Sequence, residues 1–273
     1  MSDSVADRIA SFARWHYEFD LAGHRTPIFD PAHRNRHAQR RDMVFRPLLE
    51  RYGGSLEGRR VLDLGCNAGW WALHAINLGA DFVLGVDGRP VNIEQAEFVF
   101  EVESVDRRRY AFETANLSDC DLTRHGHFDI VLCLGLLQHI SKPVELMELV
   151  AASRASVLVI DGSISRAPGS YLDLSRQGPD AIADHAVDLE LRMLPTKLAL
   201  RALVSQFGFS LAVLQPCFTS FEGCADYRSG FRRGFFCTRG GPPTEVPTEP
   251  LDRISLLRDA AAWLIAGMRH HVS

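Results

Sequence analysis

The chain is poor in lysine and lacks several signatures of special protein classes. Lys142 and Lys197 are its only lysines, and the net charge is −4, so a broad basic surface for nucleic acid is not expected. No CxxC pair or His/Cys cluster has zinc-ligand spacing, so no metal is expected. No apolar run reaches the roughly 20 residues that cross a bilayer. The start, MSDSVADRIA, has no apolar stretch of a secretory signal. We therefore expect a cytoplasmic protein without a membrane partner.

The hydrophobic pattern indicates an α/β fold. From residue 59 onward, short apolar runs alternate with amphipathic stretches, which is typical of βαβ units and a mainly parallel sheet. The expected strands are 60–64, 82–86, 109–114, 129–133, 156–160 and 209–214, with 231–238 antiparallel at the sheet edge. The expected helices are 3–18, 39–52, 69–79, 90–103, 143–153, 196–206 and 251–268, and residues 20–38 are expected to be irregular. These elements predict a Rossmann-like, doubly wound, mostly parallel seven-stranded sheet with an N-terminal helical lead-in and a C-terminal helix.

The same pattern divides the chain into three parts. Residues 1–54 have too few apolar residues for a separate core and are predicted to form a helical lid. Residues 55–240 form the central α/β domain. Within it, 162–194 interrupt the alternation, and long insertions are uncommon unless they are functional. Residues 241–273 contain a Pro-rich spacer and the last helix.

The strongest local signal is VLDLGCNAG at residues 61–69, between an expected strand and helix. Gly65 and Gly69 lack a Cβ, so they allow a sharp turn and a close approach of ligand to backbone. Asn67 is among the few other residues that accept left-handed geometry. Asp87 ends the second strand, where a carboxylate can accept hydrogen bonds from ribose hydroxyls. The layout predicts a nucleoside site.

The spacing of the glycines distinguishes among nucleoside cofactors. A dinucleotide site has G-x-G-x-x-G facing a pyrophosphate. Here Gly65 and Gly69 are four residues apart, and Asp63 precedes them. A carboxylate there would repel pyrophosphate but would suit a ligand with an ammonium group. A dehydrogenase is therefore the least favoured enzyme class.

This arrangement resembles class I S-adenosylmethionine-dependent methyltransferases over residues 55–215. The match consists of motif I at Asp63–Gly69, the ribose acid Asp87, Asn116-Leu117 after the third strand, and FDIVLCLGLLQHI at 128–140. The resemblance implies S-adenosylmethionine as cofactor, with these binding residues: Asp63, Gly65, Cys66, Asn67, Gly69, Asp87, Gly88, Asn116, Leu117 and Leu134. The lead-in at Trp15–Pro27 is similar to that of the tRNA wobble-uridine carboxymethyltransferase group. No residues that would select a carboxylated cofactor are matched, so ordinary S-adenosylmethionine is expected.

Several of these residues have a structural alternative. Asp87 could instead cap the helix that starts near Pro90, and Asn116 could cap a short turn. One of Trp70 and Trp71 is expected to pack on the sheet, and the other to border the methionine pocket.

His139 is the first candidate for a general base, because it follows the fourth strand at the ligand-binding edge of the sheet. Its alternative is a helix-end histidine bonded to the backbone. The other candidates lie in the lead-in: His16, His24, Asp30, His33 and His37. The residues expected to contact the acceptor are His16, His24, Tyr171 and Arg192.

Three functions remain open. The first is methylation of an O or N atom of a small molecule, in bacterial secondary metabolism. The second is tRNA modification, for which the basic stretch 33–41 could contact RNA, although a solvated surface is the favoured interpretation. The third is a non-catalytic cofactor-binding subunit. A homodimer through the C-terminal helix is also expected, because one face is apolar. That face comprises Leu251, Ile254, Leu257, Ala261, Leu264 and Met268.

Overall fold

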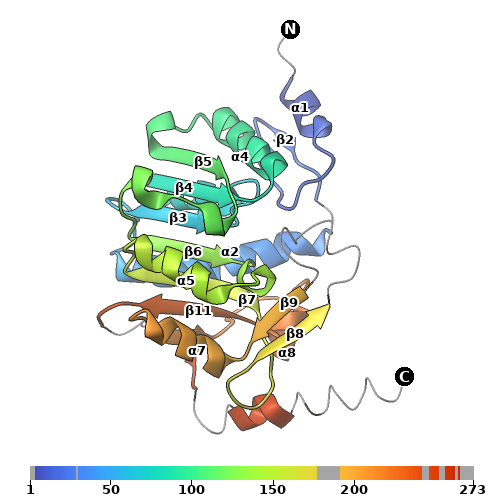
Figure 1. Ribbon diagram of the computed structural model, residues 1–273. Helices are drawn as coiled ribbons and strands as arrows, with labels where there is room; N and C mark the ends of the chain where they lie inside the picture. Colours follow the sequence, from blue (N-terminus) through green and yellow to red (C-terminus); the bar gives the residue numbers. More distant parts are fainter. Residues whose placement is uncertain are drawn as a thin grey trace.

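The apolar runs pair into one mixed sheet in the computed structural model, which describes residues 4–28, 30–176, 191–241, 246–251, 256–261 and 264. The sheet has eight strands in the order β12-β10-β11-β7-β6-β3-β4-β5 (Figure 1). Its parallel strands are β3 (Arg60–Leu64), β4 (Phe82–Asp87), β5 (Tyr110–Thr114), β6 (Ile130–Leu134) and β7 (Val157–Ser163). The antiparallel strands are β10 (Ser210–Leu214), β11 (Arg232–Thr238) and β12 (Thr248–Glu249). The predicted fold class is confirmed, with eight strands in place of seven.

Helices cover both faces of the sheet, as in a doubly wound fold. One apolar core contains residues of α2 (Ala32–Arg51), α3 (Trp70–Asn77) and α4 (Pro90–Val102). The other contains residues of α5 (Pro143–Ala152) and α7 (Lys197–Gln206). Alternate side chains of the buried strands point to opposite faces, so β6 contributes Leu132 to the first core and Val131 to the second. The helices and strands of residues 59–214 confirm the sequence prediction, with bounds that differ by a few residues.

The N-terminal segment corrects two expectations. The helix α1 ends at Ser11 (Val5–Ser11), and 20–25 form the hairpin β1–β2 (Asp20–Leu21 and His24–Arg25) instead of irregular chain. Trp15, Tyr17, Phe19 and Leu21 are all buried while the residues between them are not, so the period here is two rather than the helical period. Every second side chain of this extended segment therefore packs against the sheet domain.

The second helix also begins earlier than expected. α2 starts at Ala32 rather than near residue 39, and Asp30 Oδ1 accepts a hydrogen bond from the Ala32 amide at 2.9 Å. Pro31 precedes the helix with helical backbone angles. An acid followed by proline is a helix start signal that the apolar periodicity alone did not reveal.

The strand β11 is antiparallel as predicted, but the expectation that it lies at the sheet edge is wrong. It pairs with β7 on one side and with β10 on the other. The edge is formed by β12, which lies in the Pro-rich stretch and pairs with the end of β10. A proline-rich stretch can supply a short edge strand, because an edge needs hydrogen bonds on one side only.

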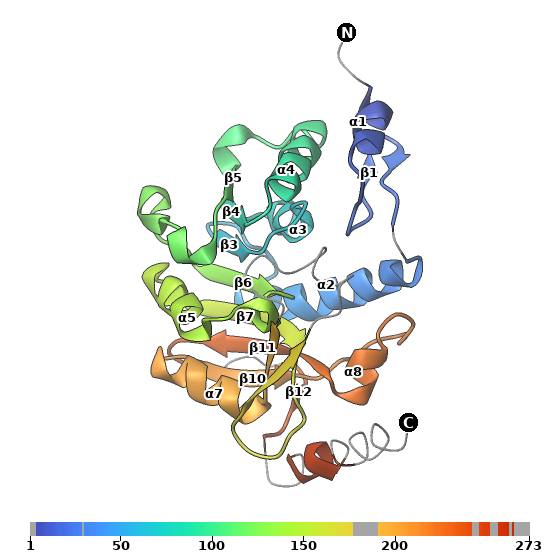
Figure 2. The same ribbon diagram turned by 45° about the vertical axis from the view of Figure 1, so that its right-hand side comes forward.

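The insertion after β7 forms a second hairpin. Its strands β8 (Leu172–Arg176) and β9 (Leu191–Pro195) are antiparallel, and a bridge between Ser165 and Thr196 attaches them to the domain. Figure 2 shows this hairpin, α2 and the β1–β2 segment on the side toward which β6 points. Both additions to the chain therefore gather near the carboxyl edge of the parallel strands.

The C-terminal helix is described only in part. Residues 256–261 and 264 are helical, whereas Ile254 and Met268 of the expected apolar face lie outside the described residues. Asp259 accepts from the buried Lys197 ammonium at 3.1 Å, and Glu249 does so at 2.9 Å. The pair with Asp259 links the described part of the helix to α7, and the pair with Glu249 links β12 to α7. Among the described residues, no helix is both long and apolar enough to span a membrane.

A buried carboxylate joins four separate segments beneath the carboxyl edge. Asp161 of β7 is fully buried and accepts from Arg40 of α2 at 2.6 Å, from Arg232 of β11 at 3.1 Å, and from the Tyr227 hydroxyl at 2.7 Å. Tyr227 lies on α8 (Ala225–Ser229). Burial alone would raise the pKa of Asp161, but Arg232 and Arg40 outweigh it and hold this pKa well below its usual range.

We predict that Asp161→Asn lowers the free energy of unfolding by about 3–5 kcal/mol, because it leaves two buried guanidinium groups without a counter-charge. The native pKa is depressed, so this contribution is present above the unfolded-state pKa of about 3.9 and is lost as the pH falls below it. Urea unfolding at pH 7 and at about pH 2.5, where much of the contribution is lost, measures the difference. Asp106→Asn, which breaks an exposed pair with Arg108, is the control and should leave the midpoint at pH 7 unchanged. An equally small effect of Asp161→Asn would refute the prediction.

Candidate functional site

The turn after β3 has the geometry that its glycines predict. Gly65, Asn67 and Gly69 all have positive φ, of 71°, 50° and 76°. A Cβ on Gly65 would lie 3.1 Å from the Leu136 side chain, and one on Gly69 would lie 3.1 Å from Phe112. The turn therefore brings bare backbone to the carboxyl edge of the sheet and closes α3 tightly onto it.

Asp63 lies at the base of this turn. It is 1% exposed, and neither carboxylate oxygen has a hydrogen-bond partner within 3.5 Å. Burial and the nearby negative charge of Asp87 raise the pKa of Asp63 to about 8, although the Ala72 amide lowers it slightly. An unpartnered buried acid is costly by itself. Its placement fits a ligand that brings an ammonium group toward it.

Asp87 at the end of β4 holds the turn together. Its Oδ2 accepts from the Asn67 amide at 2.9 Å, and its Oδ1 accepts from the Arg89 amide at 3.0 Å and from the Asn92 side chain at 2.9 Å. The N-cap of α4 is Arg89 rather than Asp87. The carboxylate is half-buried and borders two cavities.

The first cavity, of about 220 Å³, lies over the ends of β4 and β5. Asn116 and Leu117 form one side, and His139 forms another. Asn116 precedes the short helix Leu117–Asp119 without a side-chain capping bond, so its amide is not used for the turn. Gly65, Asp87 and Gly88 complete the inner end, next to the glycine turn.

The second cavity, of about 560 Å³, continues from the first toward β6 and β7. The lead-in contributes His16, Tyr17 and His33, and the β8–β9 hairpin contributes Arg176 and Arg192. Both additions to the domain thus border this cavity.

An aromatic cluster supports the lead-in side. Tyr17 stacks on Trp70 with ring centres 5.1 Å apart, and its hydroxyl accepts from Trp71 Nε1 at 2.8 Å. Both tryptophans are buried in the core. His37 packs on Tyr17 and Trp70, and burial followed by the nearby His16 lowers the pKa of His37 to about 2, so this ring is neutral at physiological pH.

The structure brings together most of the residues that the sequence singled out. The cavities are lined by Gly65, Asn67, Asp87, Gly88, Asn116, Leu117, Leu134, His139, His16 and Arg192. Cys66 lies behind the turn, fully buried, and Asp63 lies beneath it. His24 is exposed on β2, and Tyr171 is 56% exposed beside Gly169. Neither of these two lines a cavity at the carboxyl edge.

The basic stretch 33–41 corrects the favoured interpretation of a solvated surface. Arg40 is 4% exposed and reaches Asp161, while Arg36 makes a two-pronged pair with Asp226 at 2.7 Å. Arg34 faces outward, toward Glu18. Arg36 and Arg40, which point inward, are four residues apart and therefore share one face of the helix. This spacing is the sequence feature from which their common orientation could have been predicted.

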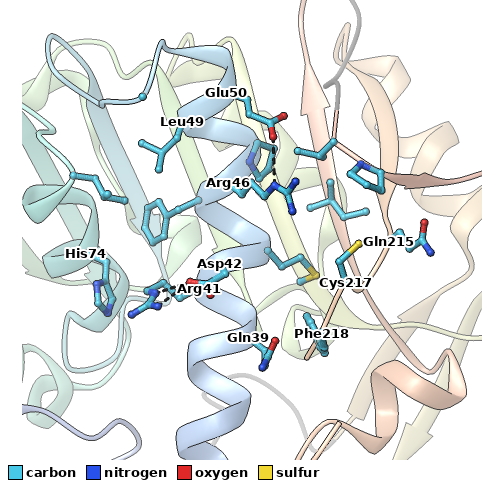
Figure 3. A pocket seen from close by; sticks show the side chains of 18 of the residues that line it. Gln39, Arg41, Asp42, Arg46, Leu49, Glu50, His74, Gln215, Cys217 and Phe218 are labelled. Atoms are coloured by element: carbon cyan, nitrogen blue, oxygen red, sulfur yellow. Dashed lines mark hydrogen bonds and ion pairs between the residues drawn. The ribbon is translucent and has the colours of Figure 1, made fainter. Parts of the chain in front are cut away.

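A larger groove of about 920 Å³ lies on the other side of α2 (Figure 3). Gln39, Arg46 and Glu50 line one wall, and Gln215 and Cys217 line the other. Arg46 and Glu50 pair with each other at 3.4 Å. No residue of the glycine turn borders this groove, so it has no direct access to the candidate site.

The fold and the site together define a Rossmann-like methyltransferase of class I. Comparison with known families agrees: the family described as "Methyltransferase domain" matches residues 33–212. The chain therefore belongs to this methyltransferase family.

Individual relatives are more distant. Ubiquinone biosynthesis O-methyltransferase of Neisseria meningitidis serogroup C is 30% identical over 120 residues, which cover 44% of this chain and 50% of that protein. The chain thus matches about half the length of this curated relative. The N-terminal domain of EvdMO1, crystallised in the presence of SAH and D-fucose, superimposes with a TM-score of 0.65 at 22% identity, over 87% of this chain and 96% of that one. Magnesium protoporphyrin IX methyltransferase of Synechocystis PCC 6803 with bound SAM gives 0.54 at 17%, over 78% and 86%.

We predict that S-adenosylhomocysteine binds more tightly as the pH rises toward 8, by up to about ten-fold per pH unit, because its ammonium favours the ionised form of Asp63 and a proton is released. Calorimetry at pH 6, 7 and 8 measures this dependence. Asp63→Asn should remove it and weaken binding, and NAD, the control ligand, should not bind. A pH-independent affinity in the wild type would contradict the assigned role of Asp63.

Proposed function

We propose that this enzyme transfers the methyl group of S-adenosylmethionine to an oxygen or nitrogen atom of a small molecule. One observation carries the proposal: the two cavities share Gly65, Asp87, Gly88, Leu136 and His139. A cofactor held along the glycine turn would therefore present its reactive end to the second cavity. That cavity falls in the size range of small-molecule sites.

The residues around the turn fit this cofactor. Asp63 would face its ammonium, the bare backbone at Gly65 would admit its amino-acid portion, and Asp87 would accept from its ribose hydroxyls. Asn116, Leu117 and Leu134 would complete the set, with Cys66, Asn67, Gly69 and Gly88 shaping the backbone around it. When bound, the cofactor supplies a methyl group already activated by a sulfonium. The protein then has mainly to align the acceptor and to remove a proton.

His139 is our candidate for proton removal, because it borders both cavities at the end of the short helix Leu137–His139. A hydroxyl in the second cavity would lie between this imidazole and the cofactor. The lead-in, through His16 and Tyr17, and the hairpin, through Arg192, would exclude water from the same space. His16 is the alternative base.

The names of the relatives support a small-molecule acceptor. The curated relative is named for ubiquinone biosynthesis, and the EvdMO1 domain was crystallised with D-fucose. We propose a role in bacterial secondary metabolism within the cytoplasm. The tRNA alternative rests on the lead-in resemblance, but Arg36 and Arg40 point inward, which leaves a smaller basic surface for RNA.

We predict that His139→Gln reduces kcat by about 10²–10⁴-fold, because a general base contributes that much, while S-adenosylhomocysteine affinity stays unchanged. The acceptor is found by incubating the enzyme with methyl-labelled cofactor and a small-molecule extract, followed by mass spectrometry. Asp87→Ala is the matched contrast: it should raise KM for the cofactor by about 10–100-fold, through loss of charge-assisted bonds. Full activity of His139→Gln would exclude it as the base, and label found only in RNA would refute the small-molecule proposal.

We further propose that the C-terminal helix pairs with its copy in a homodimer. Leu257 is 69% exposed and Leu264 is 56% exposed on the described part of this helix. Truncation of the chain after residue 248 would remove Glu249 and Asp259, which are ion-pair partners of the buried Lys197. Substitution of single residues is therefore the cleaner experiment.

Light scattering at micromolar concentration should show a dimer for the wild type and a monomer for Leu257→Lys/Leu264→Lys, because two like charges would meet across the two-fold axis. The same substitutions should leave the thermal midpoint of the monomer nearly unchanged. A monomeric wild type would disprove the dimer.

A further inference from the structure

The second cavity has an excess of positive charge among the described residues. Six arginines line it: Arg36, Arg40, Arg89, Arg176, Arg192 and Arg232. The lining contains two acids, Asp87 and Asp226, and Asp161 lies buried beneath it. Even with Asp161 included, the arginines exceed the acids that face them by a factor of two.

Arg192 has a buried donor without a partner and a neighbouring charge of the same sign. Its Nε is buried without a hydrogen-bond partner, and the charged group that acts on it is Arg232, which has the same sign. Burial and this neighbouring charge lower the pKa of Arg192. The β8–β9 hairpin thus holds a guanidinium in an environment that disfavours its charge, and an anion between Arg192 and Arg232 would relieve that cost.

Arg40 and Arg232 face the same space from the sheet side. A Cβ on Gly135, directly after β6, would lie 3.5 Å from Arg232 Nη2 and 4.0 Å from Arg40 Nη2. Arg40 is 4% exposed, and its Nη2 is buried without a partner although its Nε is bound to Asp161. Arg40 Nη2 is therefore an unused donor beside Gly135, whereas Arg232 Nη2 also donates to Asp161 at 3.3 Å.

We propose that the methyl acceptor is an anion whose compact oxyanion, a carboxylate or a phosphate, is held by Arg192 together with Arg40 and Arg232. The inference rests on the proposed function, since it assigns the substrate class of that same site. Arginine suits this role because its planar group binds two oxygens at once. The rest of the acceptor would then extend toward His139, which borders the same cavity.

The position of these arginines favours the acceptor over the carboxylate of the cofactor as the bound anion. Most of the proposed cofactor residues lie on or directly after β3, β4 and β5, and Leu134 alone lies on β6. Asp161, which fixes Arg40 and Arg232, lies on β7, two strands from β3 in the other direction. Two strand spacings amount to about 10 Å.

The test uses inorganic phosphate as the probe and the full-length protein saturated with S-adenosylhomocysteine. Phosphate should raise the melting temperature of this complex above the value in sodium chloride of equal ionic strength. Arg192→Met should bind phosphate about 10–100-fold more weakly in calorimetry, and Arg192→Lys should retain part of the affinity. The control is Arg201→Met, on the exposed face of α7, which should behave as the wild type.

A second measurement distinguishes the source of the anion. The affinities of S-adenosylhomocysteine and of 5′-methylthioadenosine, which lacks the carboxylate, are compared in the wild type and in Arg192→Met. If Arg192→Met leaves the affinity for each of the two ligands at its wild-type value, the acceptor assignment is supported. If Arg192→Met loses affinity for S-adenosylhomocysteine but not for 5′-methylthioadenosine, the arginines bind the carboxylate of the cofactor, and the acceptor assignment is overturned.

The remaining outcomes are equally decisive. If S-adenosylhomocysteine binds and phosphate does not, the anionic acceptor is wrong while the proposed function stands. If S-adenosylhomocysteine itself fails to bind, both are wrong. Circular dichroism is used to check that Arg192→Met is folded. If it is not folded, Arg192→Lys, which keeps the charge and most of the volume, takes its place in the test.

Discussion

Burial of the Asp161 carboxylate is the constraint on which the carboxyl edge of the sheet depends. A fully buried charge is tolerated only when donors surround it, and here these come from α2, α8 and β11. The helix α2 cannot move away from the sheet without separating Arg40 from this buried charge. The same contacts orient Arg40 and Arg232 toward Gly135. One interaction thus stabilises the architecture and fixes the floor of the second cavity.

The central part of the fold was predictable because its signals are local. In β3 and α3, a short apolar run, a glycine turn and a helical period follow one another within about 20 residues, and short-range sterics decide the outcome. The ends of the chain were less predictable. Trp15 and Tyr17 fall within the stretch 3–18 that was predicted to be a helix, but they lie on an extended segment because burial against the sheet overrides the local period.

The candidate site shows the same division. Gly65, Asn67 and Asp87 form a cluster that one strand-turn-helix unit and its neighbour define, so their spacing sufficed to place them. Arg40 could not be placed in this way, because its partner Asp161 is 121 residues away in the chain. A run of basic residues looks alike in sequence whether it faces solvent or a buried acid. Only tertiary packing distinguishes the two.

The β8–β9 hairpin is attached to the domain between β7 and α7, and it carries none of the residues of the glycine turn. Its exchange or remodelling would alter the outer wall of the second cavity while β3, β4 and β5 remained intact. Under the proposed function, the outer wall of the acceptor cavity could therefore change without a change in the residues around the cofactor. A change confined to this hairpin would replace Arg176 and Arg192 and leave Arg40 and Arg232 in place on α2 and β11.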